Sequence, residues 1–439
     1  MGWCGAAGMR AGFLAALLAA FLAFPYAPAA QEARPVSLTG RHIAGYQGWF
    51  GCPGDARGGA DWTHWFVRGP DGALRPAVEM LPDTTEMAPD EGCPTDWTSP
   101  AGRPLRLYSA QDPRTVERHF AWMQRYGIDG VAVQRFLSAV STPDGRAQRN
   151  QVLDNVRRAA ERHGRGFFVM YDLSGGTDER LAIVLEDWKA LLASGVVDSP
   201  AYQHHRGQPV LGLWGIGFAN RALTPEGVAA FLAALRVATP GGVTLLGGVP
   251  AGWRTGDAGA SPDPAWRAVF RGFEVLSPWT VGLFGDPPAA DRYRSDRLAP
   301  DLRETARTGQ DLMPVIFPGF SWSNLMRTRG RVTPLNQIRR RCGAFYWRQG
   351  ANAVGAGARM LYTAMFDEVD EGTAIFKLAP NPRSLPAEAG FLPLDADGCA
   401  LPPDWYLRLA GEIGRGVAAS RLPVDIPPAL NATLAAPAR

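Results

Sequence analysis

Residues 113–134 read PRTVERHFAWMQRYGIDGVAVQ and contain one complete helix-to-strand unit. Val116, Phe120 and Met123 recur at helical spacing, with a proline in the first turn and a glycine just after the last turn. The apolar run from Ile128 to Gln134 follows at once and is typical of a buried parallel strand. This unit repeats along the chain, and the repetition predicts the fold.

Seven further apolar runs have the length of buried strands. They are His42 to Tyr46, Phe167 to Tyr171, Val210 to Trp214, Val243 to Gly247, Phe273 to Ser277, Met313 to Phe317 and Met360 to Phe366. Further helices are predicted at Gln148 to His163, Asp178 to Leu192, Pro225 to Val237, Pro264 to Arg271, Pro300 to Thr308, Asn336 to Val354 and Pro403 to Ile413.

Eight strand–helix units in series predict a single α/β domain, a (β/α)8 TIM barrel, with a loop-rich insertion after the first strand that ends near Tyr108. The alternative is an open doubly wound sheet, which requires a glycine-rich phosphate loop after its first strand. Residues 45–49, GYQGW, do not have that pattern. We therefore favour the barrel.

The first thirty residues have the pattern of a secretory signal peptide. An arginine precedes a fourteen-residue apolar run, Ala11 to Phe24, and small residues follow it. That run is shorter than the roughly 18–20 residues that span a bilayer. We expect a signal peptide at 1–30, a barrel domain at 31–424 and a disordered tail at 425–439. The mature protein is then secreted or periplasmic, with no membrane attachment.

Charge and cysteine content narrow the functional class. The formal net charge is +3 and no basic run stands out, which argues against nucleic-acid binding. Four cysteines remain after signal cleavage, an even number that suits an oxidising compartment. Pairing Cys52 with Cys93 and Cys342 with Cys399 is one of three alternatives, and buried free thiols are another. No cysteine or histidine spacing predicts zinc, and we expect no metal and no cofactor.

Barrel active sites form at the C-terminal ends of the strands, and this chain places aromatic and hydrogen-bonding residues there. Flat aromatic rings suit the C–H faces of sugars, and the polar groups suit hydroxyls, so we predict a carbohydrate cleft that binds an oligosaccharide or polysaccharide. The candidate substrate-binding residues are Tyr46, Gln47, Trp49, Gln134, Arg135, Tyr171, Asp172, Trp214, Trp279 and Trp322.

An acidic cluster, FDEVDEG at residues 366–372, follows the eighth strand. Glycoside hydrolysis usually needs two carboxyl groups, and neighbouring acids push their pKa values apart so that one stays protonated. Glu368 and Glu371 are the candidate catalytic pair, and Asp367 and Asp370 are candidate substrate contacts. A solvated acidic loop and a cation site are the competing interpretations.

Four segments together resemble the family 71/99-like glycoside hydrolases. They are Gly45 to Phe50, Tyr126 to Val131, Tyr171 to Gly175 and Phe366 to Gly372. The resemblance covers nearly the whole mature chain. It implies a (β/α)8 barrel that acts on a glycan; the group includes the family 99 endo-α-mannosidases, and its bacterial members are often labelled xylosidase or arabinosidase.

The resemblance also implies roles for the two glutamates. The family 99 enzymes carry a Glu-Trp-His-Glu-Gly motif, which Glu368, Glu371 and Gly372 match, whereas Val369 and Asp370 replace the Trp and His. By resemblance, Glu368 deprotonates the substrate's 2-hydroxyl, and Glu371 protonates the leaving oxygen and later activates water, with retention of configuration.

Two other functions stay open. The barrel could bind carbohydrate without cleaving it. It could also be a xylosidase or arabinosidase with ordinary two-carboxylate chemistry, in which Asp172 is one partner.

Overall fold

The computed structural model describes residues 1–2, 37–55, 59, 61–98, 102, 104–386 and 390–432. The predicted signal peptide, apart from its first two residues, lies outside this part of the chain. None of the helices described is both long enough and apolar enough to cross a membrane.

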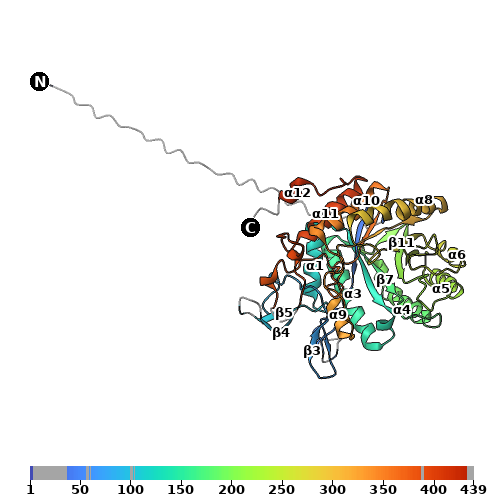
Figure 1. The fold of residues 1–439 in the computed structure, drawn as a ribbon, viewed down its shortest axis with the longest axis horizontal. Helices are drawn as coiled ribbons and strands as arrows, with labels where there is room; N and C mark the ends of the chain where they lie inside the picture. Colours follow the sequence, from blue (N-terminus) through green and yellow to red (C-terminus); the bar gives the residue numbers. More distant parts are fainter. Residues whose placement is uncertain are drawn as a thin grey trace. The chain divides into compact units, whose positions relative to one another are not determined.

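Among the described residues, eight parallel strands form the barrel sheet, and each corresponds to a predicted strand (Figure 1). Neighbours in the sheet are neighbours in the chain order of the strands, so the predicted (β/α)8 fold is confirmed. The strands are β1 (His42–Tyr46), β6 (Gly130–Phe136), β7 (Gly166–Asp172), β9 (Gln208–Trp214), β10 (Thr244–Pro250), β11 (Val275–Trp279), β12 with β13 (Asp311–Leu312 and Val315–Ile316) and β14 (Leu361–Thr363).

The short strands β12 and β13 are two halves of the seventh barrel strand. β12 pairs with β11, and β13 pairs with β14. Pro314 lies between the halves and cannot donate a ladder hydrogen bond, although its carbonyl accepts one from the Tyr362 N–H at 3.0 Å. The seventh strand therefore pairs with β11 through its first half and with β14 through its second half, and the sheet is continuous from β11 to β14.

Helices on the outer side of the sheet match most of the predicted ones (Figure 1). These are α1 (Pro113–Tyr126), α3 (Pro143–His163), α4 (Leu181–Ala193), α5 (Pro225–Ala238), α6 (Trp266–Phe270), α8 (Ala299–Thr308), α10 (Ala344–Gly355) and α11 (Trp405–Ala418). Short helices that the sequence did not predict are α2 (Leu137–Val140), α7 (Pro287–Tyr293) and α9 (Ser323–Thr328).

The helix predicted to begin at Asn336 begins eight residues later, at Ala344, so that boundary was wrong. The three residues before it, Arg341, Cys342 and Gly343, all have positive φ, which an α-helix cannot contain. Cys342 is also tied to Cys399 by a disulfide.

The tail predicted to be disordered, residues 425–439, contains a short helix, α12 (Pro428–Ala432). Pro428 is suited to the first turn of this helix. Residues 433–439 lie outside the described part of the chain.

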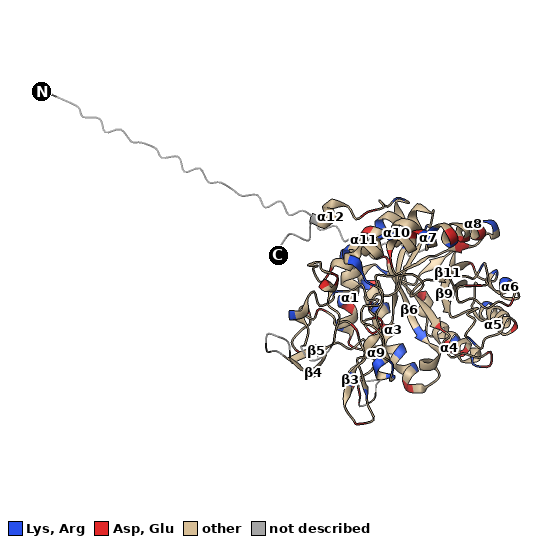
Figure 2. Ribbon diagram, in the orientation of Figure 1, with Lys and Arg blue, Asp and Glu red and all other residues tan. Residues whose placement is uncertain are grey.

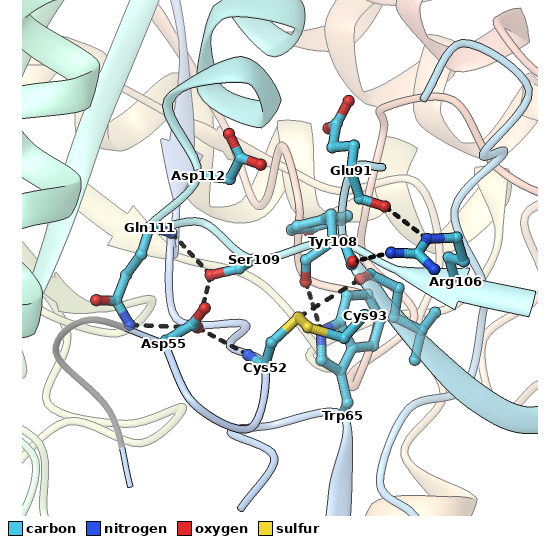
Figure 3. The surroundings of a disulfide bond; sticks show 12 residues. Cys52, Asp55, Trp65, Glu91, Cys93, Arg106, Tyr108, Ser109, Gln111 and Asp112 are labelled. Atoms are coloured by element: carbon cyan, nitrogen blue, oxygen red, sulfur yellow. Dashed lines mark hydrogen bonds between the residues drawn. A yellow bond between two sulfur atoms is a disulfide. The ribbon is translucent and has the colours of Figure 1, made fainter. Parts of the chain in front are cut away.

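The insertion after β1 forms two hairpins, β2 (Phe66–Arg68) with β3 (Leu74–Pro76) and β4 (Cys93–Thr98) with β5 (Pro104–Leu107). The predicted disulfide between Cys52 and Cys93 ties the start of the insertion to β4 (Figure 3). Next to it, the Asp55 carboxylate accepts hydrogen bonds from the Cys52 N–H at 2.8 Å and the Ser109 hydroxyl at 2.7 Å. Of the three pairings that the sequence left open, the one with Cys52–Cys93 and Cys342–Cys399 is formed, and both disulfides fix loops that carry little regular structure.

Basic and acidic residues are interspersed along the helices and loops of the barrel (Figure 2). Many of them form pairs, such as Arg118 with Glu91 and Arg348 with Asp291.

Side chains of each barrel strand alternate between the barrel interior and the surrounding helices. Gly45 of β1 faces the interior, where a Cβ atom would lie 1.9 Å from Met365 Sδ and 2.2 Å from Tyr362 Oη. The missing side chain therefore leaves room for the residues that lead into the acidic cluster.

We predict that Gly45→Ala lowers the free energy of unfolding by about 1–3 kcal/mol, because the buried neighbours must shift to admit the methyl group. Urea unfolding of the mature protein would measure this. Gly285→Ala is the matched control, since its Cβ would meet Ile338 at an ordinary 3.5 Å. Equal stability of the two variants would contradict the assignment of Gly45 to the packed interior.

Candidate active site

The acidic cluster, residues 366–372, forms a loop at the C-terminal end of β14, hereafter the acid loop. Its start is fixed by the Phe366 N–H, which donates to the Gly45 carbonyl at 2.7 Å. Its end folds back, because the N–H groups of Thr373 and Ala374 both donate to the Glu368 carbonyl. The loop is thus held in place at the mouth of the barrel.

The Asp367 carboxylate joins the acid loop to the end of β1. Its two oxygens accept hydrogen bonds from the backbone N–H groups of Gln47, at 2.7 Å, and Gly48, at 2.9 Å. Gly48 has a φ of 55°, a left-handed conformation that lets two successive N–H groups converge on one anion. Asp367, which was predicted to contact substrate, is fully buried. Its hydrogen bonds position the loop.

Glu368 is held by donors on both carboxylate oxygens. The Gln47 side-chain amide donates to Oε1, and the Thr373 hydroxyl donates to Oε2 at 2.6 Å. Burial, together with the charges of Glu371 and Asp370, raises the pKa of Glu368 well above its usual range, and the two donors offset only part of this rise. The same glutamine therefore contacts Asp367 through its backbone and Glu368 through its side chain.

Glu371 is half-buried, and among the described residues no group donates a hydrogen bond to its carboxylate. Burial and the charge of Asp370 raise the pKa of Glu371 to about 7, and Asp172 adds to the effect, while Arg329 at the end of α9 opposes it. A carboxyl group with this pKa can donate a proton near neutral pH.

The backbone around Glu371 is held by hydrogen bonds from the segment after Phe320 and from the insertion. The Ser321 N–H donates to the Glu371 carbonyl at 2.9 Å, and the Ser321 hydroxyl donates to the buried Glu79 carboxylate at 2.6 Å. Glu79 also bonds through its N–H to the Val369 carbonyl at 2.8 Å. Further along, the Arg340 guanidinium donates to the Gly372 and Ala374 carbonyls. Contacts from three separate segments therefore fix the backbone of the acid loop.

Asp370 faces His64, a residue of the insertion that the sequence analysis did not single out. The His64 Nδ1 lies 3.4 Å from Asp370 Oδ2. The imidazole stacks on Trp49, with ring centroids 4.0 Å apart and planes 6° apart. Trp49 is 8% exposed and its other contacts include Phe136, so His64 covers the ring that was predicted to meet substrate.

The opposite wall of the mouth contains Asp172, Trp214 and Trp279, at the ends of β7, β9 and β11. Asp172 pairs in register with Trp214, and the rings of Trp214 and Trp279 meet edge to face at 5.3 Å. Burial raises the pKa of Asp172, and Arg221 opposes it. Both tryptophans are partly exposed. The three residues thus lie at the C-terminal ends of their strands, and their role in substrate binding stays a prediction.

The interior beneath the site is closed by Gln134 and Tyr362. The Gln134 amide donates to the Tyr362 hydroxyl at 3.0 Å. Burial and the charges of Glu368 and Asp367 raise the pKa of Tyr362 well above its usual range. Both side chains are almost fully buried, so Gln134 supports the floor of the site and lies below the position expected for a substrate contact.

Three predicted substrate-binding residues, Tyr46, Arg135 and Tyr171, face the helices and not the site, so those assignments were wrong. The Tyr46 hydroxyl meets His119 of α1 at 3.0 Å. Arg135 makes two 2.8 Å hydrogen bonds to Asp187 of α4, and the Tyr171 hydroxyl donates to the same carboxylate at 2.6 Å. The physical reason is strand alternation: each lies next to an inward-facing residue, which places it on the outer face.

Trp322 is partly exposed and contacts Phe320 at 5.2 Å, on the segment that bonds to the acid loop. Residues that the sequence analysis missed are His64, Thr373, Tyr362 and Arg329. Period-two alternation along β14 could have identified Tyr362, because Thr363 beside it faces α10. No local pattern could have identified His64, which a distant loop brings to the site. The residues that the structure describes include no group of three His, Cys, Asp or Glu arranged to hold a metal ion.

The fold and site define a (β/α)8 barrel with clustered carboxylates at its C-terminal mouth, and comparison with solved structures agrees. No protein-family model matches the sequence, and no curated protein matches it. The structure is similar to two structures of the family 99 endo-α-mannosidase of Bacteroides thetaiotaomicron, one of them in complex with BIS-TRIS-propane, with TM-scores of 0.61 and 0.60. Each match is 14% identical and covers 88% of this chain and 99% of the other. At this identity the match shows the fold alone, a barrel similar to that of the family 99 enzymes.

We predict that replacing Asp367 changes how stability depends on pH. Burial raises the pKa of Asp367 from 3.8 to about 7, so the folded protein holds this proton more tightly than the unfolded chain. The resulting stability is fully present below about pH 4 and is lost as the pH rises through about 7, a change of about 4 kcal/mol at most.

Urea unfolding of the wild type and Asp367→Asn between pH 4 and 8 tests this. The asparagine places an amide opposite the N–H groups of Gln47 and Gly48, which is a cost that does not depend on pH. The stability of the wild type relative to the variant should therefore fall as the pH rises. Parallel curves would show that Asp367 titrates normally.

Proposed function

We propose that this protein is an exported glycosidase that cleaves an α-linked glycan with retention, through participation of the substrate's 2-hydroxyl. The observation that carries the proposal is the pair Glu368 and Glu371. Both are buried or half-buried at the barrel mouth, and each has a pKa raised by burial and by neighbouring negative charge. The fold similarity to family 99 endo-α-mannosidases supports the substrate class.

In the first step, Glu368 takes the proton of the 2-hydroxyl, and the 2-oxygen attacks C1 from the face opposite the leaving oxygen. The bond from C1 to that oxygen breaks as Glu371 gives it a proton. The product is a 1,2-anhydro sugar, with no bond to the enzyme. In the second step, Glu371 takes a proton from water, the water oxygen attacks C1, and the 2-oxygen recovers its proton from Glu368. Two inversions at C1 give retention.

The hydrogen bonds around the two glutamates support this division of roles. Glu368 must be ionised to act as the base, and the donors from Gln47 and Thr373 stabilise its carboxylate. Glu371 must be protonated to act as the acid, and its position next to Asp370 favours the protonated form. Because the charge of Glu371 is one of the causes that raise the pKa of Glu368, a proton on Glu371 favours the ionised form of Glu368.

The N-terminal sequence and the disulfides support export. Residues 1–30 have the pattern of a signal peptide. The two disulfides, Cys52–Cys93 and Cys342–Cys399, suit the periplasm or the outside of the cell, where thiols are oxidised.

A second candidate function has one observation in its favour. Asp172 lies at a strand end, its pKa is raised by burial, and its charge reaches Glu371. In a xylosidase or arabinosidase with ordinary two-carboxylate chemistry, Asp172 would be the nucleophile and Glu371 the acid/base. This route predicts a covalent glycosyl-enzyme ester, which the proposed mechanism lacks.

We expect Glu371→Gln and Glu368→Gln each to reduce kcat by at least about 1000-fold, because each removes a proton transfer and its charge. The assay is reducing-end release by the mature protein from α- and β-linked manno-, xylo- and arabino-oligosaccharides. Asp172→Asn is the discriminating variant. A small effect of Asp172→Asn supports 2-hydroxyl participation, since Asp172 then acts only as a substrate contact.

Other outcomes would change the assignment. A trapped ester on Asp172, seen as added mass on a peptide containing this residue, favours the second candidate. Equal activity of wild type and Glu371→Gln contradicts the site. Binding of a sugar by the wild type with no cleavage of any substrate points to a barrel that binds carbohydrate without catalysis.

We also expect kcat/KM to fall above about pH 7. Burial and the charge of Asp370 raise the pKa of Glu371 to about 7, so the acid loses its proton as the pH rises through that value. Initial rates between pH 4 and 9 on any cleaved substrate would locate this limb. A profile that stays flat to pH 9 would exclude Glu371 as the proton donor.

A further inference from the structure

His64 is held in an unusual backbone conformation next to the acid loop. Its φ is 61°, in the left-handed region that side chains other than glycine rarely adopt. The residue before it, Thr63, makes two backbone hydrogen bonds of 3.1 Å with Gly51, one in each direction. The insertion is therefore anchored just before His64, and the left-handed turn directs the imidazole to Asp370. Such backbone outliers concentrate at functional sites.

The imidazole of His64 contacts Trp49, Asp370 and, edge to face at a centroid distance of 6.1 Å, Phe50, and its side chain is still partly exposed. Trp49 covers one face at a centroid distance of 4.0 Å, and Asp370 lies 3.4 Å from Nδ1. The side chain of His64 is nevertheless 36% exposed, compared with 4% for Asp370. A carboxylate beside Nδ1 favours a proton on that nitrogen, which leaves Nε2 free to accept a hydrogen bond.

Asp370 adds a second, independent feature. It is 2% exposed, and its Oδ1 atom has no hydrogen-bond partner among the described residues. A buried carboxylate oxygen without a donor is costly, and a hydroxyl supplied by a ligand would remove that cost. Asp370 also lies close enough to both glutamates for its charge to raise the pKa of each. Asp370 directly precedes Glu371 in the chain, so its unpaired oxygen belongs to the same short loop as both glutamates.

We propose that His64 and Asp370 form a subsite that binds a sugar ring of the substrate beside Glu368 and Glu371. One hydroxyl of that ring donates to Asp370 Oδ1, and another donates to the His64 Nε2. The open face of the imidazole packs against the C–H face of the ring, a role that the buried Trp49 cannot take. The identity of the ligand as a sugar rests on the proposed function, whereas the geometry of the subsite does not.

The experiment measures binding apart from catalysis. Calorimetric titrations use the Glu371→Gln protein and the panel of manno-, xylo- and arabino-oligosaccharides, because this background binds without turnover. His64→Asn is added to that background. Asparagine tolerates a positive φ, so the variant removes the ring and keeps the backbone. His163→Asn, at the end of α3 where the imidazole forms hydrogen bonds with Gln124 and Glu117, is the matched control.

We expect His64→Asn to weaken binding of the oligosaccharide at least 10-fold and His163→Asn to leave it unchanged. In the active protein, His64→Asn should raise KM by a similar factor with little change in kcat, because the subsite contacts ground state and transition state alike. Adding Asp370→Asn to His64→Asn should weaken binding by less than the two separate effects combined, since the two side chains act as a pair.

Unchanged affinity of His64→Asn would overturn the proposal. So would weaker binding that scales with loss of folded protein, measured by circular dichroism of the same sample. If the wild type cleaves no sugar but binds one, the proposed function fails and the affinity comparison still tests the subsite. If the parent protein binds none of the sugars, the subsite is overturned.

Discussion

The hydrogen bonds of the Asp367 carboxylate to the N–H groups of Gln47 and Gly48 are the constraint on which the site depends. They connect the end of the first strand, β1, to the loop after the last strand, β14, which pairs with β1. Once Asp367 is fixed, the next residue, Glu368, meets the side chain of the same Gln47. Arg149 of α3 supports this arrangement from outside, because its guanidinium donates to the Gln47 and Gly48 carbonyls. The contacts that join the first strand to the loop after the last strand therefore also fix the positions of the Asp367 and Glu368 carboxylates.

Burial makes this arrangement chemically useful as well as stable. A carboxyl group removed from water and placed beside other negative charges holds its proton to higher pH. Asp367, Glu368, Glu371 and Asp172 all show this shift, and burial is its largest cause in each. The hydrogen-bond donors that offset the cost of burying these carboxylates are distributed unevenly. Asp367 and Glu368 accept hydrogen bonds on both carboxylate oxygens. Among the described residues, no group donates a hydrogen bond to the Glu371 carboxylate. The acid loop therefore holds its two glutamates in different hydrogen-bonding environments.

The insertion after β1 has a larger part in the site than its irregular sequence suggests. It supplies His64 to the front of the acid loop and Glu79 to the back, through contacts with Asp370, Ser321 and the Val369 carbonyl. The disulfide between Cys52 and Cys93 and the Gly51–Thr63 backbone pair give this segment the rigidity that its short hairpins lack. The aromatic wall of Trp214 and Trp279 comes from the opposite strands, so the site lies between a rigid sheet end and a loop that disulfide bonding stabilises.

The sequence by itself determined the eight-stranded barrel, the insertion and the position of the acid loop. It limited the cysteine pairing to three alternatives, and the structure decided among them. Hydrophobic periodicity and helix termini are local properties, so a single chain segment reveals them. Tertiary structure alone decided which strand-end residues face the mouth: Gln47, Asp172, Trp214 and Trp279 do, and Tyr46, Arg135 and Tyr171 do not. A one-residue change in strand register reverses the direction of every side chain, and predicted strand ends are not that accurate. Tertiary structure also brought His64 to Asp370, because contacts between residues about 300 positions apart leave no local pattern in the sequence.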